Sequence, residues 1–174
     1  TITFMLSLLK KTAERDADVR AGKWRTADNF AYYVGSRSSD GFAGQTIGLV
    51  GLGRIGTRVA QLLAPWRARI IAYDPYVPPA HFLTHGVTAV DYETLLRESD
   101  VVSFHVVLTR ETRYMFGEEQ LKLMKPNAIV LNTARGKVLD EKALARAIDE
   151  GRVRGAAIDA FEEEPLPMLS LIHI

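Results

Sequence analysis

The sequence has no cysteine among its 174 residues. Disulfide bonds, thiolate metal ligands and cysteine nucleophiles are therefore excluded, and a reducing cytoplasmic location fits this composition. An excess of one charge is also missing, because 22 Lys and Arg against 21 Asp and Glu give a net charge of +1 with no block of basic residues. We therefore expect no nucleic-acid partner.

Long apolar runs are absent as well. The opening TITFMLSLLKK is too short to span a bilayer, follows no basic stretch and precedes no cleavage site, so we expect no membrane partner. Its residues Ile2, Met5, Leu6 and Leu9 recur at helical spacing. We predict a leading helix over residues 1–21, entered midway in a chain that is truncated before Thr1.

The composition is that of one globular domain, with 47% hydrophobic and 25% charged residues. After an irregular connection over residues 22–44, short apolar runs alternate with helical patterns. The predicted strands are 46–51, 69–74, 87–90, 101–106, 128–134 and 154–161. Strands that are apolar throughout and alternate with helices predict an α/β fold, a doubly wound parallel sheet (Rossmann fold) with helices on both faces.

The helices between these strands carry recognisable signals. Residues 54–64 form a helical pattern with Ile55, Val59, Leu62 and Leu63 on one side. Another helix begins near Asp91. A third is capped by Asp140 and ends at Gly151, with an inner face of Leu144, Ala147 and Ile148.

The turn GLGRIG places Gly51, Gly53 and Gly56 in a G-x-G-x-x-G pattern between a strand and a helix. Such glycines allow a tight turn, close approach of a pyrophosphate and close packing of helix on strand. The next strand ends in Asp74, which can bind ribose hydroxyls and would repel the extra phosphate of NADP. We predict dinucleotide binding, with NAD as the cofactor.

Further polar residues follow the other strands. In open parallel sheets ligands bind beyond the carboxyl ends of the strands, and Asp74, His105, Thr133, Arg135 and Asp159 all occupy such positions. Arg135 lies in NTARG, where its fork of donors could hold a carboxylate and a neighbouring keto oxygen.

Taken with these residues, the segments GQTIGLVGLGRIG, YDPY, SFHVVLTRET, LMKPNAIVLNTARG and AIDEGRVRGAAIDAFEEEP resemble the NAD-binding domain of the D-isomer-specific 2-hydroxyacid dehydrogenases, of the phosphoglycerate dehydrogenase kind. The resemblance covers residues 1 to 167. It implies an NAD-dependent oxidoreductase that transfers hydride between nicotinamide and a 2-oxo or 2-hydroxy acid. Members of the family usually dimerise through this domain, so the apolar first helix predicts a homodimer.

The resemblance also implies roles for single residues. Gly51, Gly53, Arg54, Ile55 and Gly56 would meet the pyrophosphate and Asp74 the adenine ribose. Val106, Thr133, Ala134 and Arg135 would line the cofactor, and Asp159 would hold the nicotinamide carboxamide. Arg135 and Glu164 are the predicted catalytic residues, Arg135 binding the oxo acid and Glu164 pairing with a catalytic histidine whose pKa it raises.

The chain departs from the family pattern in three places. Val107 stands where proline is usual, and the first half of the substrate domain, which would precede Thr1, is absent. In the family the histidine follows the Glu at nearly twice the distance between Glu164 and His173, and it lies inside a Pro-His turn that is missing here, so we do not expect His173 to be the catalytic acid. We divide the chain into an NAD-binding domain, 1–168 (Rossmann core 45–168), and a non-native tail, 169–174, and expect cofactor binding without appreciable turnover.

The sequence also allows other interpretations. A non-catalytic NAD(H)-sensing module of the corepressor kind would share the fold and similar residues. His81 and His85 fit surface positions on a short helix better than a metal site, and we predict no metal. His105 is either a cofactor contact or a hydrogen-bonded structural residue. Glu162 and Glu163 are interpreted as solvated charges, and Trp24 and Trp66 as packing residues.

Overall fold

The central sheet runs in parallel throughout. The computed structural model describes residues 1–23, 42 and 44–165. In this part of the chain a 6-stranded sheet has the order β3-β2-β1-β4-β5-β6. The strands are β1 Thr46–Val50, β2 Arg69–Tyr73, β3 Thr88–Ala89, β4 Val101–Phe104, β5 Ile129–Asn132 and β6 Gly155–Ile158. The strand order reverses between β1 and β4, which pair directly, so the crevice that binds ligands in such sheets is expected there.

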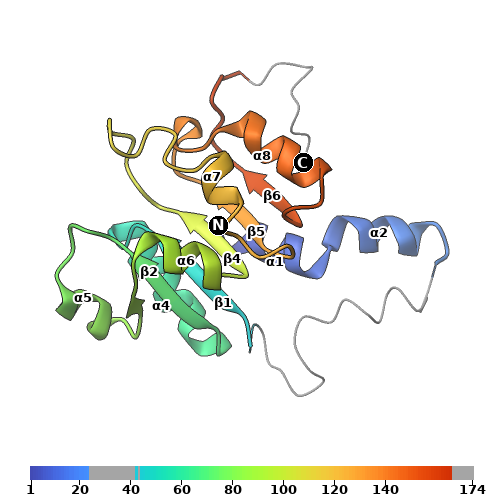
Figure 1. The fold of residues 1–174 in the computed structure, drawn as a ribbon. Helices are drawn as coiled ribbons and strands as arrows, with labels where there is room; N and C mark the ends of the chain where they lie inside the picture. The colour runs from blue at the N-terminus through green and yellow to red at the C-terminus, as the bar shows by residue number, and fades with distance from the viewer. Residues whose placement is uncertain (24–41, 43, 166–174) are drawn as a thin grey trace.

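Helices cover both faces of this sheet (Figure 1). They are α1 Ile2–Lys10, α2 Thr12–Arg20, α4 Arg54–Leu63, α5 Pro79–Thr84, α6 Tyr92–Glu98, α7 Glu118–Leu121 and α8 Glu141–Asp149, with short turns η1 Ala64–Trp66 and η2 Gly136–Val138. One apolar cluster packs α1, α4 and α5 on the sheet, and a second packs α6, α7 and α8 on the opposite face. The predicted doubly wound α/β fold is confirmed.

Two helices begin at the predicted aspartates, and each aspartate caps its helix. Oδ1 of Asp91 accepts a hydrogen bond from the backbone N–H of Thr94 at 2.8 Å, and Oδ1 of Asp140 accepts one from Ala143 at 2.9 Å. Each bond satisfies a donor that the first turn of a helix otherwise leaves unpaired. Gly151 follows α8 with φ +68°, as expected for a residue that ends a helix. The short helix α7 was not predicted from the sequence.

The prediction of one leading helix over residues 1–21 was wrong. Lys11 adopts a left-handed conformation with φ 51° and separates α1 from α2. α1 has an apolar face, whereas α2 has no buried residue and extends away from the sheet (Figure 1). Val19 is the one large apolar residue of α2 and is 55% exposed, so little apolar surface is available to hold α2 against the core.

The apolar face of α1 is largely used within this chain. Met5 and Leu9 are buried at 0% and 3% exposure, and α1 contacts β5 and β6. Burying side chains of this size contributes about 1.5–3 kcal/mol each. Part of the apolar face of α1 therefore belongs to the core of this chain, and Ile2, Phe4, Leu6 and Leu8 are only partly buried.

The apolar side that the sequence predicted for α4 is only partly buried. Val59 and Leu63 are buried as expected, but Ile55 and Leu62 are 62% and 46% exposed. Gly56 and Ala60 take the inner positions instead, because small residues let the helix approach β1 closely. This rotation turns Ile55 toward the carboxyl ends of the strands.

Residues 24–41, 43 and 166–174 lie outside the described residues. They include most of the predicted connection, Trp24 and His173. Trp66 packs against Phe42, with ring centroids 4.8 Å apart, which confirms its packing role. In the described ranges no helix is long and apolar enough to cross a membrane.

Candidate cofactor and substrate site

The glycine turn joins β1 to α4 at the carboxyl edge of the sheet. Gly51 has φ +95°, a conformation that only glycine adopts readily, and its N–H donates to the carbonyl of Tyr73 at 2.9 Å. A Cβ on Gly56 would lie 2.1 Å from the carbonyl oxygen of Gly51. A Cβ on Gly53 would meet nothing within 4 Å. The first and third glycines thus serve the fold, while the second leaves open space at the start of α4.

Asp74 lies just after β2, beside this turn. Its Oδ2 accepts a hydrogen bond from the backbone N–H of Leu52 at 2.8 Å, and its Oδ1 accepts one from Tyr76 at 2.9 Å. Both oxygens are therefore held in place by backbone donors before any ligand arrives. A carboxylate keeps further lone pairs beyond these two bonds, so ribose hydroxyls can still donate to it.

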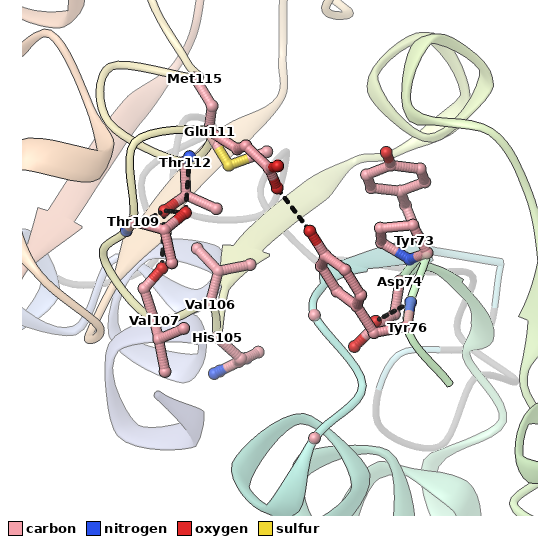
Figure 2. Close-up of a pocket in the computed structure, with 13 residues that line it drawn as sticks. Tyr73, Asp74, Tyr76, His105, Val106, Val107, Thr109, Glu111, Thr112 and Met115 are labelled. Carbon is pink, nitrogen blue, oxygen red and sulfur yellow. Dashed lines mark hydrogen bonds between the residues drawn. The ribbon is translucent and has the colours of Figure 1, made fainter. Parts of the chain in front are cut away.

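A cavity of about 460 Å³ opens from the glycine turn past Asp74 (Figure 2). It lies between the loop after β2 and the loop after β4. Its lining is Gly51, Gly53, Tyr73, Asp74, Pro75, Tyr76, His105, Val106, Val107, Thr109, Glu111, Thr112 and Met115. The size and the mainly apolar walls suit one half of a dinucleotide.

The loop after β4 separates this cavity from a second one. His105, Val106 and Val107 line both, and Val107, where the family pattern has proline, is 75% exposed. His105 forms a 3.0 Å hydrogen bond with Ser103 through Nε2. Burial lowers the pKa of His105 to about 4, so the ring is neutral near pH 7. His105 is therefore a hydrogen-bonded residue, as one interpretation of the sequence held, and it also lines both cavities.

The second cavity, of about 400 Å³, lies beyond β5. It is lined by Ile55, His105, Val106, Val107, Leu108, Thr133, Ala134 and Arg135. Arg135 is exposed, and its Nη1 donates to the carbonyl of Ala134 at 2.7 Å. Thr133 shares a 2.8 Å hydrogen bond with the hydroxyl of Thr1, which brings the start of α1 to the same edge.

Asn132 holds the turn that carries these residues, and the sequence reasoning did not single it out. It is fully buried at the end of β5. Its Nδ2 donates to the carbonyl of Arg135 at 2.9 Å, and its Oδ1 accepts from Ala134 at 3.1 Å. A buried amide with both ends satisfied fixes the backbone locally. The position of Asn132, a polar residue at the end of an apolar strand, was the feature of the sequence that could have predicted this role.

The acidic segment 161–164 packs against the same turn. A Cβ on Gly136 would lie 1.9 Å from the carbonyl carbon of Phe161, so only glycine allows this approach. Oε1 of Glu164 accepts from the backbone N–H of Phe161 at 2.9 Å. The glycine after Arg135 therefore brings the segment that carries Glu164 against the Arg135 turn.

Glu162 is more than the solvated charge that the sequence suggested. The Tyr114 hydroxyl donates to its carboxylate, and its backbone N–H donates to Glu141 at 2.6 Å. Burial, followed by the nearby Glu162 and Glu164 charges, raises the pKa of Glu141. Tyr114 has φ 52°, unusual for a non-glycine residue, and it links the loop after β4 to the acidic segment.

The remaining predicted positions lie at the edges of this region. Asp159 is exposed directly after β6, and its N–H donates to the carbonyl of Asn132 at 2.9 Å. Arg54 begins α4 but lines a separate groove beside the glycine turn, together with Arg58 and His81. Arg54 and Ile55 thus point to different sides of the turn.

His81 is half-buried, so its interpretation as a surface residue was incomplete. Its Nε2 lies 2.9 Å from the hydroxyl of Thr57 and 3.1 Å from the carbonyl of Leu52. Its ring also packs edge-on against His85, with centroids 4.7 Å apart. In the described part of the chain, no group of three or more His, Asp or Glu is placed to hold a metal ion.

A tight glycine turn, an acid at the end of β2 and two adjoining cavities at the switch point define a dinucleotide-binding domain. The family model for the D-isomer specific 2-hydroxyacid dehydrogenase, NAD binding domain, matches residues 2–173. The chain therefore belongs to this family, and the predicted resemblance and the NAD cofactor are confirmed.

Individual relatives agree with this assignment. The chain is 44% identical over 161 residues to a glyoxylate reductase of Thermococcus litoralis, covering 92% of this chain and 48% of that protein. It is 38% identical over 180 residues to a D-3-phosphoglycerate dehydrogenase of Methanocaldococcus jannaschii, covering 100% and 32% respectively. A crystal structure of D-lactate dehydrogenase from Aquifex aeolicus, complexed with NAD and lactic acid, matches with TM-score 0.82 and 33% identity, covering 94% and 47%. The chain thus spans about half or less of the length of these proteins.

Proposed function

We propose that this chain is the cofactor-binding part of an NAD-dependent oxidoreductase that acts on D-2-hydroxy acids, with residues 1–168 forming one domain. The observation that carries the proposal is the pair of cavities that share His105, Val106 and Val107 at the switch point of the sheet. The glycine turn and Asp74 belong to the first cavity, and Arg135 belongs to the second. An extended dinucleotide would place adenosine in the first and nicotinamide in the second.

The second cavity offers the groups that an oxo acid needs. Arg135 would bind the carboxylate and polarise the keto oxygen through its planar fork of donors. Thr133 and Ala134 would line the nicotinamide, and Asp159 would accept from its carboxamide. Glu164 would pair with a histidine that protonates the oxygen when hydride reaches the carbon.

Binding measurements on the chain test this proposal. Calorimetric titration with NADH should give one site, with weaker binding of NADPH. Oxamate, an unreactive mimic of a 2-oxo acid, should bind the NADH complex in an Arg135-dependent way. Arg135→Ala should weaken oxamate at least about tenfold, since charge-assisted hydrogen bonds are lost.

The matched control is Arg97→Ala, which removes a surface arginine of α6 that pairs with Glu93 at 2.8 Å. It should change neither NADH nor oxamate binding. Absence of NADH binding would contradict the cofactor assignment of this chain, and equal oxamate affinity in both variants would contradict the role of Arg135.

We also propose a homodimer and a cytoplasmic location. The partly exposed residues of α1, Ile2, Phe4, Leu6 and Leu8, leave apolar surface beside the buried Met5 and Leu9. Sedimentation at micromolar concentration tests the dimer, and Leu6→Glu should dissociate it. A monomer in both forms would contradict it. The lack of cysteine supports the location.

A further inference from the structure

The first cavity contains a charged group that the proposed function leaves unused. Its walls are mainly apolar, with Pro75, Val106 and Met115 among them, yet the carboxylate of Glu111 stands at its rim. Figure 2 shows the Glu111 side chain and the ring of Tyr76 pointing toward one another from two different loops. The Tyr76 hydroxyl donates a hydrogen bond to Oε2 of Glu111.

The order of groups along the cavity identifies the ligand atoms that reach this rim. The glycine turn receives the pyrophosphate, and Asp74 lies beside it for the ribose. The nicotinamide half extends the other way, toward Arg135 in the second cavity. The purine base must therefore continue past Asp74, between the two loops, with its outer edge toward Tyr76 and Glu111.

Both sides of this rim are positioned without a ligand. The backbone N–H of Tyr76 donates to Asp74 at 2.9 Å, which anchors the first loop. On the second loop, the Thr112 hydroxyl donates to the carbonyl of Val107 at 2.6 Å and accepts from the N–H of Thr109 at 2.8 Å. Preorganised groups lose less conformational entropy when a ligand binds.

Glu111 retains capacity for a ligand. In the described part of the chain, its carboxylate has one hydrogen bond, from Tyr76. An ionised carboxylate has about four lone-pair sites and no donor. It therefore favours a base edge that donates and disfavours one that presents a keto oxygen.

We propose that Glu111 selects the base of the cofactor, accepting a hydrogen bond from the 6-amino group of adenine while Tyr76 holds the carboxylate in place. This inference rests on the proposed NAD-binding function. It adds a specificity-determining residue at the base, distinct from Asp74 at the ribose. The sites differ in what they discriminate, because Asp74 faces the 2′ position and Glu111 faces the purine edge.

The test compares NADH with the reduced dinucleotide in which unsubstituted purine replaces adenine, so that only the amino group is missing. Calorimetric titration of the full chain should give about three- to tenfold weaker binding of the purine analogue, the value of one hydrogen bond at a partly solvated rim. Glu111→Ala should weaken NADH to the level of the analogue and leave the analogue's affinity within about twofold.

Glu119→Ala is the matched control, since it removes the same charge from an exposed pair with Lys122 on α7. It should preserve the ratio of the two affinities. Equal binding of NADH and the analogue by the unmodified chain would overturn the inference while leaving the proposed function intact. Equal weakening of both ligands by Glu111→Ala would also overturn the inference. It would indicate that the hydrogen bond from Tyr76 to Glu111 only holds the two loops together. Failure of the unmodified chain to bind NADH would overturn both proposals.

Discussion

Alanine substitutions at the second and third glycines of the turn should have different effects. Gly56→Ala should lower stability, whereas Gly53→Ala should weaken cofactor binding without a loss of stability. In Gly56→Ala, the new Cβ would lie 2.1 Å from the carbonyl oxygen of Gly51, more than 1 Å inside normal contact. Both groups belong to the backbone, so α4 must move away from β1. Overpacking costs about 1–3 kcal/mol, and a contact of 2.1 Å with a backbone oxygen belongs to the upper part of that range, about 2–3 kcal/mol, of which the better helix propensity of alanine offsets about 1 kcal/mol.

The cost of the clash therefore exceeds the gain in helix propensity. We expect Gly56→Ala to lower the free energy of unfolding by about 1–2 kcal/mol and the Tm by about 2–8 °C. Differential scanning calorimetry of the chain without ligand measures both. Weaker NADH binding should follow, because the amides at the start of α4 move with the helix.

Gly53→Ala makes the opposite prediction. Gly53 has φ −73°, which alanine adopts without strain, and its Cβ would meet no atom within 4 Å. Stability should stay the same or rise by about 0.4–1 kcal/mol, because alanine restricts the unfolded chain. The methyl group instead occupies the space where a pyrophosphate approaches. Losing one or two charge-assisted hydrogen bonds should raise the Kd for NADH about tenfold or more.

Of the two variants, only Gly56→Ala should therefore lose stability. A loss of stability in Gly53→Ala equal to that in Gly56→Ala would refute the assignment of open space at Gly53. Unchanged NADH affinity in Gly53→Ala would refute the position of the pyrophosphate at this turn.

Three further outcomes are expected. Asp74→Asn should narrow the preference for NADH over NADPH by relieving charge repulsion, as measured by titration with both cofactors, and an unchanged ratio would contradict the role of Asp74. The pKa of His105 is lowered to about 4, so stability should be constant above pH 6.5 and fall, by up to about 3 kcal/mol, between pH 6.5 and 4 as the unfolded chain binds the proton first. Urea denaturation at pH 7 and pH 5 should show about 2 kcal/mol of this loss, and His105→Gln should remove that part of the pH dependence. Tyr114→Phe deletes the hydroxyl that donates to Glu162, so amide exchange should quicken in residues 161–164 while NADH affinity stays unchanged.

Local patterns were enough to predict the fold and the cofactor. Alternation of apolar strands with helices predicted the parallel sheet, and Asp91 and Asp140 marked two helix starts that the structure confirms. The glycine spacing and Asp74 predicted the turn and its acid, which the backbone N–H of Leu52 joins by a hydrogen bond. The helix caps depend on residues three positions apart, where hydrogen-bonding preferences act directly. The turn and Asp74 are 22 positions apart and were predicted from the spacing of a known motif.

The orientation and bending of helices were less predictable. Periodicity placed Ile55 and Leu62 on one side of α4, but Gly56 and Ala60 are the residues that are buried in their stead. A period fixes which residues share a side, whereas the packing distance to the sheet decides which side turns inward. The break at Lys11 was not predicted either, because the apolar spacing ends with α1 and α2 after it buries no residue.

The sequence by itself determined the strands, the order of motifs and the chemistry of the glycine turn. Only the tertiary structure decided which distant residues meet. Tyr76 and Glu111 are 35 positions apart, and Tyr114 and Glu162 are 48 apart, yet each pair forms a hydrogen bond. The need for glycine at position 136 is likewise explained only by the tertiary structure, in which the backbone of Phe161 passes beside it. Such contacts depend on strand order and register, which bring loops from separate crossovers to one edge of the sheet, and no local pattern records that arrangement.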